Sequence, residues 1–255
     1  MKLTPLFLSL LLFVGTATVN AQTTEVIAHR GFWKTDGSAQ NSITALLKAD
    51  SIGCYGSEFD VWLTKDNQLV VNHDATYQSK SMEGSNASEL TALTLSNGEH
   101  LPTLEAYLKA GKKTKTRLIL ELKAHQTPER ETQAVEAIVK LVKNMKLEKR
   151  MEYITFSEHA LKEFIRLAPA GTPTFYLKGD RSPEELQSLG ATGVDYNLGI
   201  FRQKPEWIQS CHDLGLKVNV WTVNKKEDME WLIEHKVDFV TTNEPLLLES
   251  LLPKK

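Results

Sequence analysis

The chain has 255 residues, a formal net charge of −2 and two cysteines, and 41% of its residues are hydrophobic. A charge so close to zero argues against a surface built for nucleic acid or for an anionic membrane. The spacing of Cys54 and Cys211 suits neither a zinc site nor a redox motif. We expect both thiols to stay free, because a core of this size needs no covalent cross-link.

The first residues have the pattern of a secretory signal peptide. Lys2 precedes an apolar stretch from Leu6 to Val14, and a tail of small residues ends at Ala21. The apolar stretch is too short for a comfortable bilayer span, and small residues favour cleavage. We therefore expect residues 1–21 to be removed and the protein to be periplasmic or secreted, without stable membrane insertion. No linker-like composition divides residues 22–255, which we interpret as one domain of undetermined oligomeric state.

Strand and helix patterns alternate along the mature chain. The expected strands are 26–29, 57–61, 69–73, 117–122, 152–156, 173–177, 193–197, 217–223 and 237–241. The expected helices are 41–52, one opening at Pro102–Glu105, 128–145, 158–167, 182–189, 204–214, 225–235 and a short one from Pro245. Such alternation predicts a parallel sheet with crossover helices.

The link between the second and third expected strands decides the strand count. It is too short for a crossover helix, so 69–73 is interpreted as the returning arm of a β-hairpin. Eight strands then remain, which predicts an α/β fold of the (β/α)₈ TIM-barrel type with a β-hairpin arm. The alternative is a doubly wound open sheet. That fold favours a glycine-rich phosphate turn after the first strand, and the segment His29–Trp33 has no such pattern.

Ionisable residues lie at or near the carboxyl ends of four expected strands. They are His29, Arg30, Glu58, Asp60, His73, Glu121 and Lys123. The carboxyl ends of barrel strands meet on one rim, where such side chains would form a metal-assisted acid–base site.

Glu58 and Asp60 are two residues apart on one strand, so they share a face and repel each other. A cation between them would remove that repulsion, and Glu121 could supply a third oxygen ligand. Carboxylates without cysteine suit Ca²⁺ or Mg²⁺ better than Zn²⁺. The alternative is a solvated strand end with ordinary salt bridges to Arg30 and Lys123.

His29 and His73 are candidates for a general acid and a general base, because imidazole titrates near neutrality. Arg30 and Lys123 could hold a phosphate. Hydrogen-bonded strand-end histidines and simple ion pairs with the carboxylates are the alternatives.

A set of motifs resembles the glycerophosphodiester phosphodiesterase family, within the phospholipase-C-like phosphodiesterases. The matching stretches are 28–31, 40–42, 57–66, 70–74, 101–105, 120–123, 218–224 and 238–245. They follow the family's order and span nearly the whole mature chain.

The resemblance implies a TIM barrel with a short insertion, residues 75–100, after the His73-Asp74 motif. It implies metal-dependent hydrolysis of glycerophosphodiesters to sn-glycerol 3-phosphate and an alcohol. The implied site consists of the metal ligands Glu58, Asp60 and Glu121 for one Ca²⁺ or Mg²⁺, the acid–base pair His29 and His73, and the substrate-binding residues Arg30, Lys123, Trp221 and Asn41. Gln40 stands where the family usually has Glu, so an amide replaces a charge.

Three alternatives remain open. A related phosphodiesterase could act on another lipid head group, which would favour an apolar rim with Phe32, Trp33 and Phe201 as candidates. A non-catalytic phosphoglycerol-binding barrel would not need both histidines and all three carboxylates. A barrel glycosidase would use paired carboxylates without the histidines or the phosphate-binding cations. The sequence does not assign the acid and the base between the two histidines.

Overall fold

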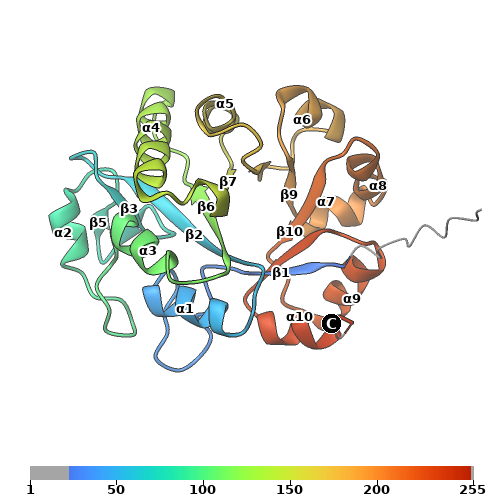
Figure 1. The fold of residues 1–255 in the computed structure, drawn as a ribbon, viewed down its shortest axis with the longest axis horizontal. Helices are drawn as coiled ribbons and strands as arrows, with labels where there is room; N and C mark the ends of the chain where they lie inside the picture. Colours follow the sequence, from blue (N-terminus) through green and yellow to red (C-terminus); the bar gives the residue numbers. More distant parts are fainter. Residues whose placement is uncertain (1–22, 254–255) are drawn as a thin grey trace, which may run out of the picture.

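A computed structural model describes residues 23–253, which form a closed barrel surrounded by helices (Figure 1). The eight parallel strands are β1 (Glu25–Ala28), β2 (Gly56–Leu63), β6 (Arg117–Leu122), β7 (Met151–Thr155), β8 (Thr174–Tyr176), β9 (Gly193–Asn197), β10 (Lys217–Trp221) and β11 (Phe239–Thr242). Pairing of β1 with both β11 and β2 closes the ring. The (β/α)₈ prediction is confirmed, and the open sheet is excluded.

The predicted hairpin arm is also confirmed. Strand β2 is longer than the barrel needs, and its last residues pair antiparallel with β3 (Leu69–Val71), with Leu63 opposite Leu69. Asn67 adopts a left-handed conformation in the turn, which asparagine tolerates better than most residues. The hairpin therefore carries the chain directly from β2 to His73.

Helices cover the outside of the barrel, mostly one after each parallel strand (Figure 1). They are α1 (Ile43–Ser51), α3 (Leu104–Gly111), α4 (Pro128–Met145), α5 (Glu158–Leu167), α6 (Pro183–Leu189), α7 (Leu198–Gln203), α8 (Glu206–Asp213), α9 (Lys226–Glu234) and α10 (Pro245–Leu251), with a 3₁₀ turn at Glu148–Arg150. Ser42, Thr103 and Ser182 accept hydrogen bonds from the first turns of α1, α3 and α6. These caps define the helix starts.

The helix expected over 204–214 is present as α8, but the structure has a second short helix, α7, directly before it that the sequence did not predict. Pro205 has no backbone N–H and disfavours helical geometry at the preceding residue, so Lys204 leaves the helix at φ −135°. Asn197, the last residue of β9, caps α7 by accepting from Gly199 N at 2.9 Å, a signal that the strand pattern obscured.

Residues 75–100 form a small structured insertion rather than a plain polar loop. It contains a two-stranded ribbon, β4 (Thr76–Tyr77) with β5 (Lys80–Ser81), and helix α2 (Ala87–Thr91). Its buried residues include Met82 and Leu90, which pack with Trp62 and Val70 of the hairpin. In Figure 1 the insertion lies at one side of the barrel, outside α3. It is therefore anchored to the same hairpin that positions His73.

The hydrophobic core has two layers. Inside the barrel, β-strand residues such as Ile27, Ile119 and Phe175 pack together. Outside it, leucines, valines and aromatic rings fill the space between strands and helices. This core fixes the strand ends and hence the rim where the candidate site lies. Among residues 23–253, no helix has the length and apolar character that crossing a bilayer requires.

Candidate active site

The turn after β1 brings its own residues against β2. Arg30 and Gly31 both have positive φ, and a Cβ on Gly31 would lie 2.6 Å from Ala45 Cβ, so only glycine fits there. This tight turn aims the Arg30 backbone N–H at Glu58, with N to Oε2 at 2.8 Å. The first strand end is thereby joined to the predicted metal ligands.

The three predicted carboxylate ligands are buried and adjacent. Oxygen atoms of Glu58, Asp60 and Glu121 all lie within 4.8 Å of one another. Asp60 and Glu121 are opposite each other in the β2–β6 register, and Glu58 lies two residues earlier on β2. The register thus explains why residues distant in sequence converge.

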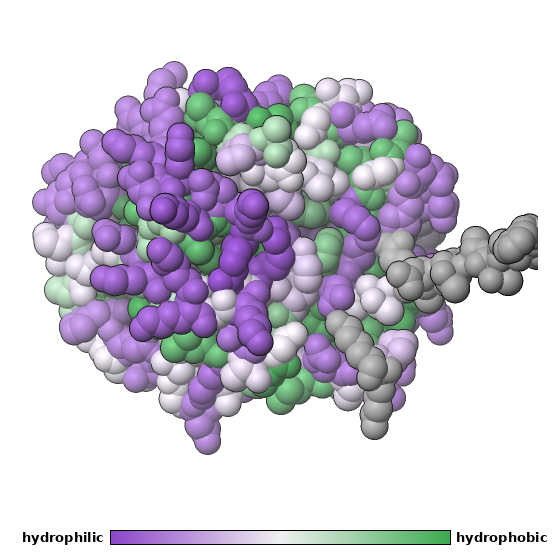
Figure 2. All heavy atoms as spheres, viewed as in Figure 1, coloured by the Kyte–Doolittle hydropathy of each residue, from purple (hydrophilic) through white to green (hydrophobic). Residues whose placement is uncertain are grey.

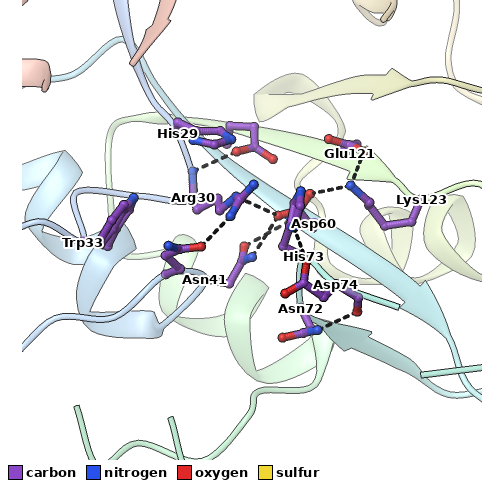
Figure 3. Close-up of polar contacts among 12 residues, drawn as sticks. His29, Arg30, Trp33, Asn41, Asp60, Asn72, His73, Asp74, Glu121 and Lys123 are labelled. Atoms are coloured by element: carbon purple, nitrogen blue, oxygen red, sulfur yellow. Dashed lines mark hydrogen bonds and ion pairs between the residues drawn. The ribbon is translucent and has the colours of Figure 1, made fainter. Parts of the chain in front are cut away.

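Two cationic side chains contact this cluster, as Figure 3 shows. Lys123 Nζ lies 2.7 Å from Glu121 Oε1 and 3.3 Å from Asp60 Oδ1. Arg30 Nε lies 3.8 Å from Asp60 Oδ2, and its Nη1 donates to Gln40 Oε1 at 2.5 Å. The ion pairs proposed as an alternative role therefore do form, but three carboxylates still face only two cations.

The pKa values of the carboxyl groups reflect this crowding. Burial, with repulsion from Asp60 and Glu121, raises the pKa of Glu58 well above its usual value. Burial and the Asp60 charge raise the pKa of Glu121 to about 7. Burial opposes ionisation of Asp60 as well, but Lys123 and other partners hold its pKa below the usual value. The cluster therefore has an excess of negative charge that a cation would stabilise.

The donor set fits a hard divalent cation. Glu58 Oε1 is buried and has no hydrogen-bond partner, an arrangement that costs free energy unless something binds it. Three convergent carboxylates without a thiol match the oxygen ligands of Ca²⁺ or Mg²⁺. These residues can hold the metal ion that the sequence predicts.

His29 is buried on the same rim. Its Nδ1 lies 2.8 Å from Asn243 Oδ1. Burial, with the nearby Arg30 charge, lowers the pKa of His29 to about 4. The ring is therefore neutral at pH 7, with one nitrogen available as a proton acceptor.

His73 reaches the site from the hairpin side. Its Nδ1 lies 2.8 Å from Asp74 Oδ1, and an ionised carboxylate can only accept, so the ring donates. Burial lowers the pKa of His73, although the Asp60 charge opposes this effect. The Asp74 carboxylate would stabilise a positive charge on His73 more than the Asn243 amide would stabilise one on His29.

Two cavities meet at His73. The central one, of about 100 Å³, is lined by both predicted histidines, by Arg30 and Lys123, and by Glu58 and Glu121. Trp221, Phe156 and Leu177 add apolar surface to it. A second cavity, of about 470 Å³, lies between the β1–α1 loop and the insertion and is lined by Trp33, Gln40, His73, Asp74 and Tyr77, among others. His73 lines both cavities, whereas His29 lines only the central one.

Asn41 lies on the second cavity but directs its amide to Asp60 rather than outward. Its Nδ2 donates to Asp60 Oδ2 at 2.8 Å, and its Oδ1 accepts from Asp60 N at 3.1 Å. Trp221 Nε1 donates to Asp195 O at 2.9 Å, which fixes the indole at the central cavity. The predicted site residues therefore all come together on one rim.

Three residues at this site have contacts that the sequence did not predict; of these, only Trp33 was considered, as a candidate rim residue. Asn243 and Trp33 form hydrogen bonds next to His29. Asp195 lines the central cavity with a buried Oδ1 that has no partner, and burial raises its pKa well above the usual value. Asn243 lies within one of the stretches that resemble the family, residues 238–245, and that resemblance is the sequence feature that could have indicated it.

Comparison with known families gives a match for residues 29–247 to the glycerophosphoryl diester phosphodiesterase family. The chain belongs to this family. The match includes both strand-end histidines and all three buried carboxylates, so the resemblance inferred from motifs is confirmed.

Individual relatives agree with this assignment. A glycerophosphodiester phosphodiesterase from Caldanaerobacter subterraneus subsp. tengcongensis is 29% identical over 91% of this chain and 98% of its own length. The crystal structure of a glycerophosphodiester phosphodiesterase from Parabacteroides distasonis is 52% identical, with a TM-score of 0.89 over 90% of this chain and 97% of that one. A phosphodiesterase from Oleispira antarctica, solved with its product sn-glycerol-3-phosphate, shares the fold at 24% identity and a TM-score of 0.75, covering 90% and 96% of the two chains.

Proposed function

We propose that this chain hydrolyses glycerophosphodiesters to sn-glycerol 3-phosphate and an alcohol, with one Ca²⁺ or Mg²⁺ held by Glu58, Asp60 and Glu121. The observation that carries the proposal is the meeting of two imidazoles, three buried carboxylates and two cations at one cavity. When bound, the divalent cation would stabilise negative charge on the phosphate and favour ionisation of a nearby hydroxyl.

The two cavities support one orientation of the substrate in the site. The phosphoglycerol part would occupy the central cavity, where Arg30 and Lys123 can hold anionic oxygens and Trp221 gives an apolar surface for the glycerol carbons. The alcohol would occupy the second cavity, beyond His73. Gln40 binds Arg30 and so orients that guanidinium.

This direction assigns the two histidines. His29 takes the proton from the glycerol 2-hydroxyl while the oxygen of that hydroxyl attacks phosphorus. The bond from phosphorus to the leaving alcohol then breaks. His73, between the cavities, donates a proton to that alcohol. Water then opens the cyclic phosphate: His73 takes the proton of the water, and His29 returns a proton to the glycerol oxygen.

The alternatives have less support. Phe201 is fully buried and Phe32 is partly buried against the core, so the candidates leave little apolar surface for a lipid. In Figure 2 hydrophobic side chains are scattered over the visible face, and hydrophilic ones dominate the side where α2–α4 lie. A non-catalytic binder would not need the complete set of ionisable groups. Export directed by residues 1–21 is a further proposal that rests on the sequence alone, because those residues lie outside the described part of the chain.

The test is release of sn-glycerol 3-phosphate by the mature chain, residues 22–255, detected with a coupled dehydrogenase. The substrates are glycerophosphocholine, glycerophosphoethanolamine, glycerophosphoinositol and vesicles of intact phosphatidylcholine. We expect release from the deacylated diesters and none from the vesicles. Release of diacylglycerol from vesicles would indicate a lipid-active enzyme instead. Diester binding without any product would indicate a binding protein.

A further inference from the structure

We propose that Asn243 is a positioning residue that holds His29 in a single tautomer, and that Trp33 determines which end of the Asn243 amide faces the imidazole. The catalytic part of this inference rests on the proposed function, in which His29 accepts a proton. The tautomer itself depends only on the hydrogen bonds described below.

Barrel closure places Asn243 beside His29. Ala28 of β1 pairs with Thr242 of β11, and His29 N donates to Thr242 O at 2.9 Å. His29 and Asn243, the residues that directly follow these two strands, therefore lie side by side on the rim. Across this junction, Asn243 Oδ1 lies 2.8 Å from His29 Nδ1.

A hydrogen bond between an amide and an imidazole is ambiguous by itself, because each side can donate or accept. Trp33 removes the ambiguity. Its Nε1 lies 3.0 Å from the same Asn243 atom, and an indole nitrogen can only donate. A rotated amide would direct its NH₂ group at the indole N–H, placing two donors against each other. The Asn243 atom shared by the two rings must therefore be the oxygen.

The state of His29 follows from this assignment. An oxygen acceptor requires His29 Nδ1 to carry hydrogen, so in the neutral ring Nε2 has the free lone pair. His29 lines the central cavity together with Glu58 and His73. Nε2 is thus the nitrogen that can accept a proton from a bound hydroxyl. The other tautomer would present an N–H there and could not act as a base.

Asn243 is itself held in place. Its backbone N donates to Asn224 Oδ1 at 2.8 Å, and Thr242 Oγ1 contacts the same oxygen at 3.3 Å. Glu244 N donates to Thr242 Oγ1 at 2.9 Å. These bonds fix the backbone from which the Asn243 side chain extends, so the amide is a rigid support for the imidazole.

The test is long-range ¹H–¹⁵N NMR of the ¹⁵N-histidine-labelled mature chain at pH 7.5, which distinguishes the two imidazole tautomers. The variants are Asn243→Leu, which keeps the size and removes the acceptor, Asn243→Asp, which keeps an acceptor, and Trp33→Phe, which removes the indole donor. His235 is the internal control, because its Nδ1 lies 2.7 Å from Trp231 O, a backbone acceptor that none of these substitutions removes. A constant His235 signal shows that a variant is folded.

We expect the Nδ1–H tautomer of His29 in the wild type and in Asn243→Asp, and a mixture in Asn243→Leu and in Trp33→Phe. For Asn243→Leu we also expect kcat to fall roughly 100-fold or more while KM stays within a few-fold, with partial recovery in Asn243→Asp. An Nε2–H tautomer in the wild type, or an unchanged tautomer and kcat in Asn243→Leu, would overturn the role of Asn243. A single tautomer in Trp33→Phe would overturn the role of Trp33. If the wild type hydrolyses no diester at all, the proposed function fails while the tautomer result stands.

Discussion

Asn41 forms two hydrogen bonds with Asp60: its Nδ2 donates to Asp60 Oδ2 at 2.8 Å, and its Oδ1 accepts from the Asp60 backbone N at 3.1 Å. Asn41 has a φ of 60°, a left-handed conformation that asparagine tolerates and that turns its amide toward β2. Family resemblance placed Asn41 with the substrate, but these contacts support a role in orienting a predicted metal ligand.

We therefore expect Asn41→Ala to weaken activation by the metal roughly 10–100-fold, because removing a partner of a ligand loosens that ligand. The measurement is the concentration of Ca²⁺ or Mg²⁺ that gives half-maximal rate. Gln40→Ala is the matched control: Gln40 binds Arg30 instead of a carboxylate, so it should raise KM for the diester and leave the metal requirement unchanged. A normal metal requirement in Asn41→Ala would contradict this role.

In the absence of bound metal, we expect the free energy of unfolding to increase as the pH falls from 8 to 6.5. The folded-state pKa of Glu121 is raised to about 7, and that of Glu58 is also raised, both mainly by burial. In that range the folded chain binds more protons than the unfolded chain, so stability is gained on acidification and lost as the pH rises. We expect a change of about 1 kcal/mol, or roughly 2–4 °C in Tm, in EDTA.

Below pH 6.5 the trend should weaken and then reverse, because the lowered pKa values of His29, His73 and His125 make the unfolded chain the better proton acceptor. Saturating Ca²⁺ should reverse the trend above pH 6.5, since bound carboxylates must be ionised. Thermal melts at several pH values, with EDTA and with Ca²⁺, check both statements. A Tm in EDTA that rises from pH 6.5 to 8 would contradict the charge excess.

The two thiols should be unreactive in the native protein. Both Cys54 and Cys211 are free and buried, and burial raises the pKa of each thiol to about 12. A thiol that does not ionise near neutral pH reacts slowly with alkylating agents. Iodoacetamide followed by mass spectrometry should modify neither residue in buffer and both in denaturant. A mass that corresponds to an intramolecular disulfide would refute the prediction of free thiols.

The acid and base roles can be separated by changing the leaving group. A diester with a p-nitrophenyl leaving group needs no proton on the departing oxygen, whereas glycerophosphocholine does. We expect His73→Ala to lose roughly 100-fold or more in kcat on glycerophosphocholine and to recover most of it on the p-nitrophenyl ester. His29→Ala should be impaired on both, because the attacking hydroxyl still needs a base. Recovery in His29→Ala instead of His73→Ala would reverse the assignment.

Much of the fold could be predicted because each barrel strand can be recognised from its own short stretch of sequence. Short apolar runs with ionisable residues near their ends are a property of the strand alone, and the hairpin followed from a link too short for a helix. Helix α7 was missed because it begins directly after the last residue of β9, with no intervening segment to separate a helix pattern from the strand pattern.

The ionisable residues of the site could be predicted for the same reason, but their supporting residues could not. Asn243 and His29 are 214 residues apart, and only closure of the barrel between β1 and β11 brings them together. An amide has no charge pattern that would mark it in a sequence. Trp33 was considered only for an apolar rim, because nothing in the sequence indicates that its indole donates to Asn243.

The most direct test of this account is release of sn-glycerol 3-phosphate from glycerophosphocholine by the mature chain after EDTA treatment and again after Ca²⁺ or Mg²⁺ is restored, with Glu58→Gln alongside. The account predicts loss of release in EDTA, recovery with the cation in the wild type, and no recovery in a folded Glu58→Gln variant. Release that is unchanged by EDTA, or restored equally in Glu58→Gln, would contradict a metal held by the buried carboxylates.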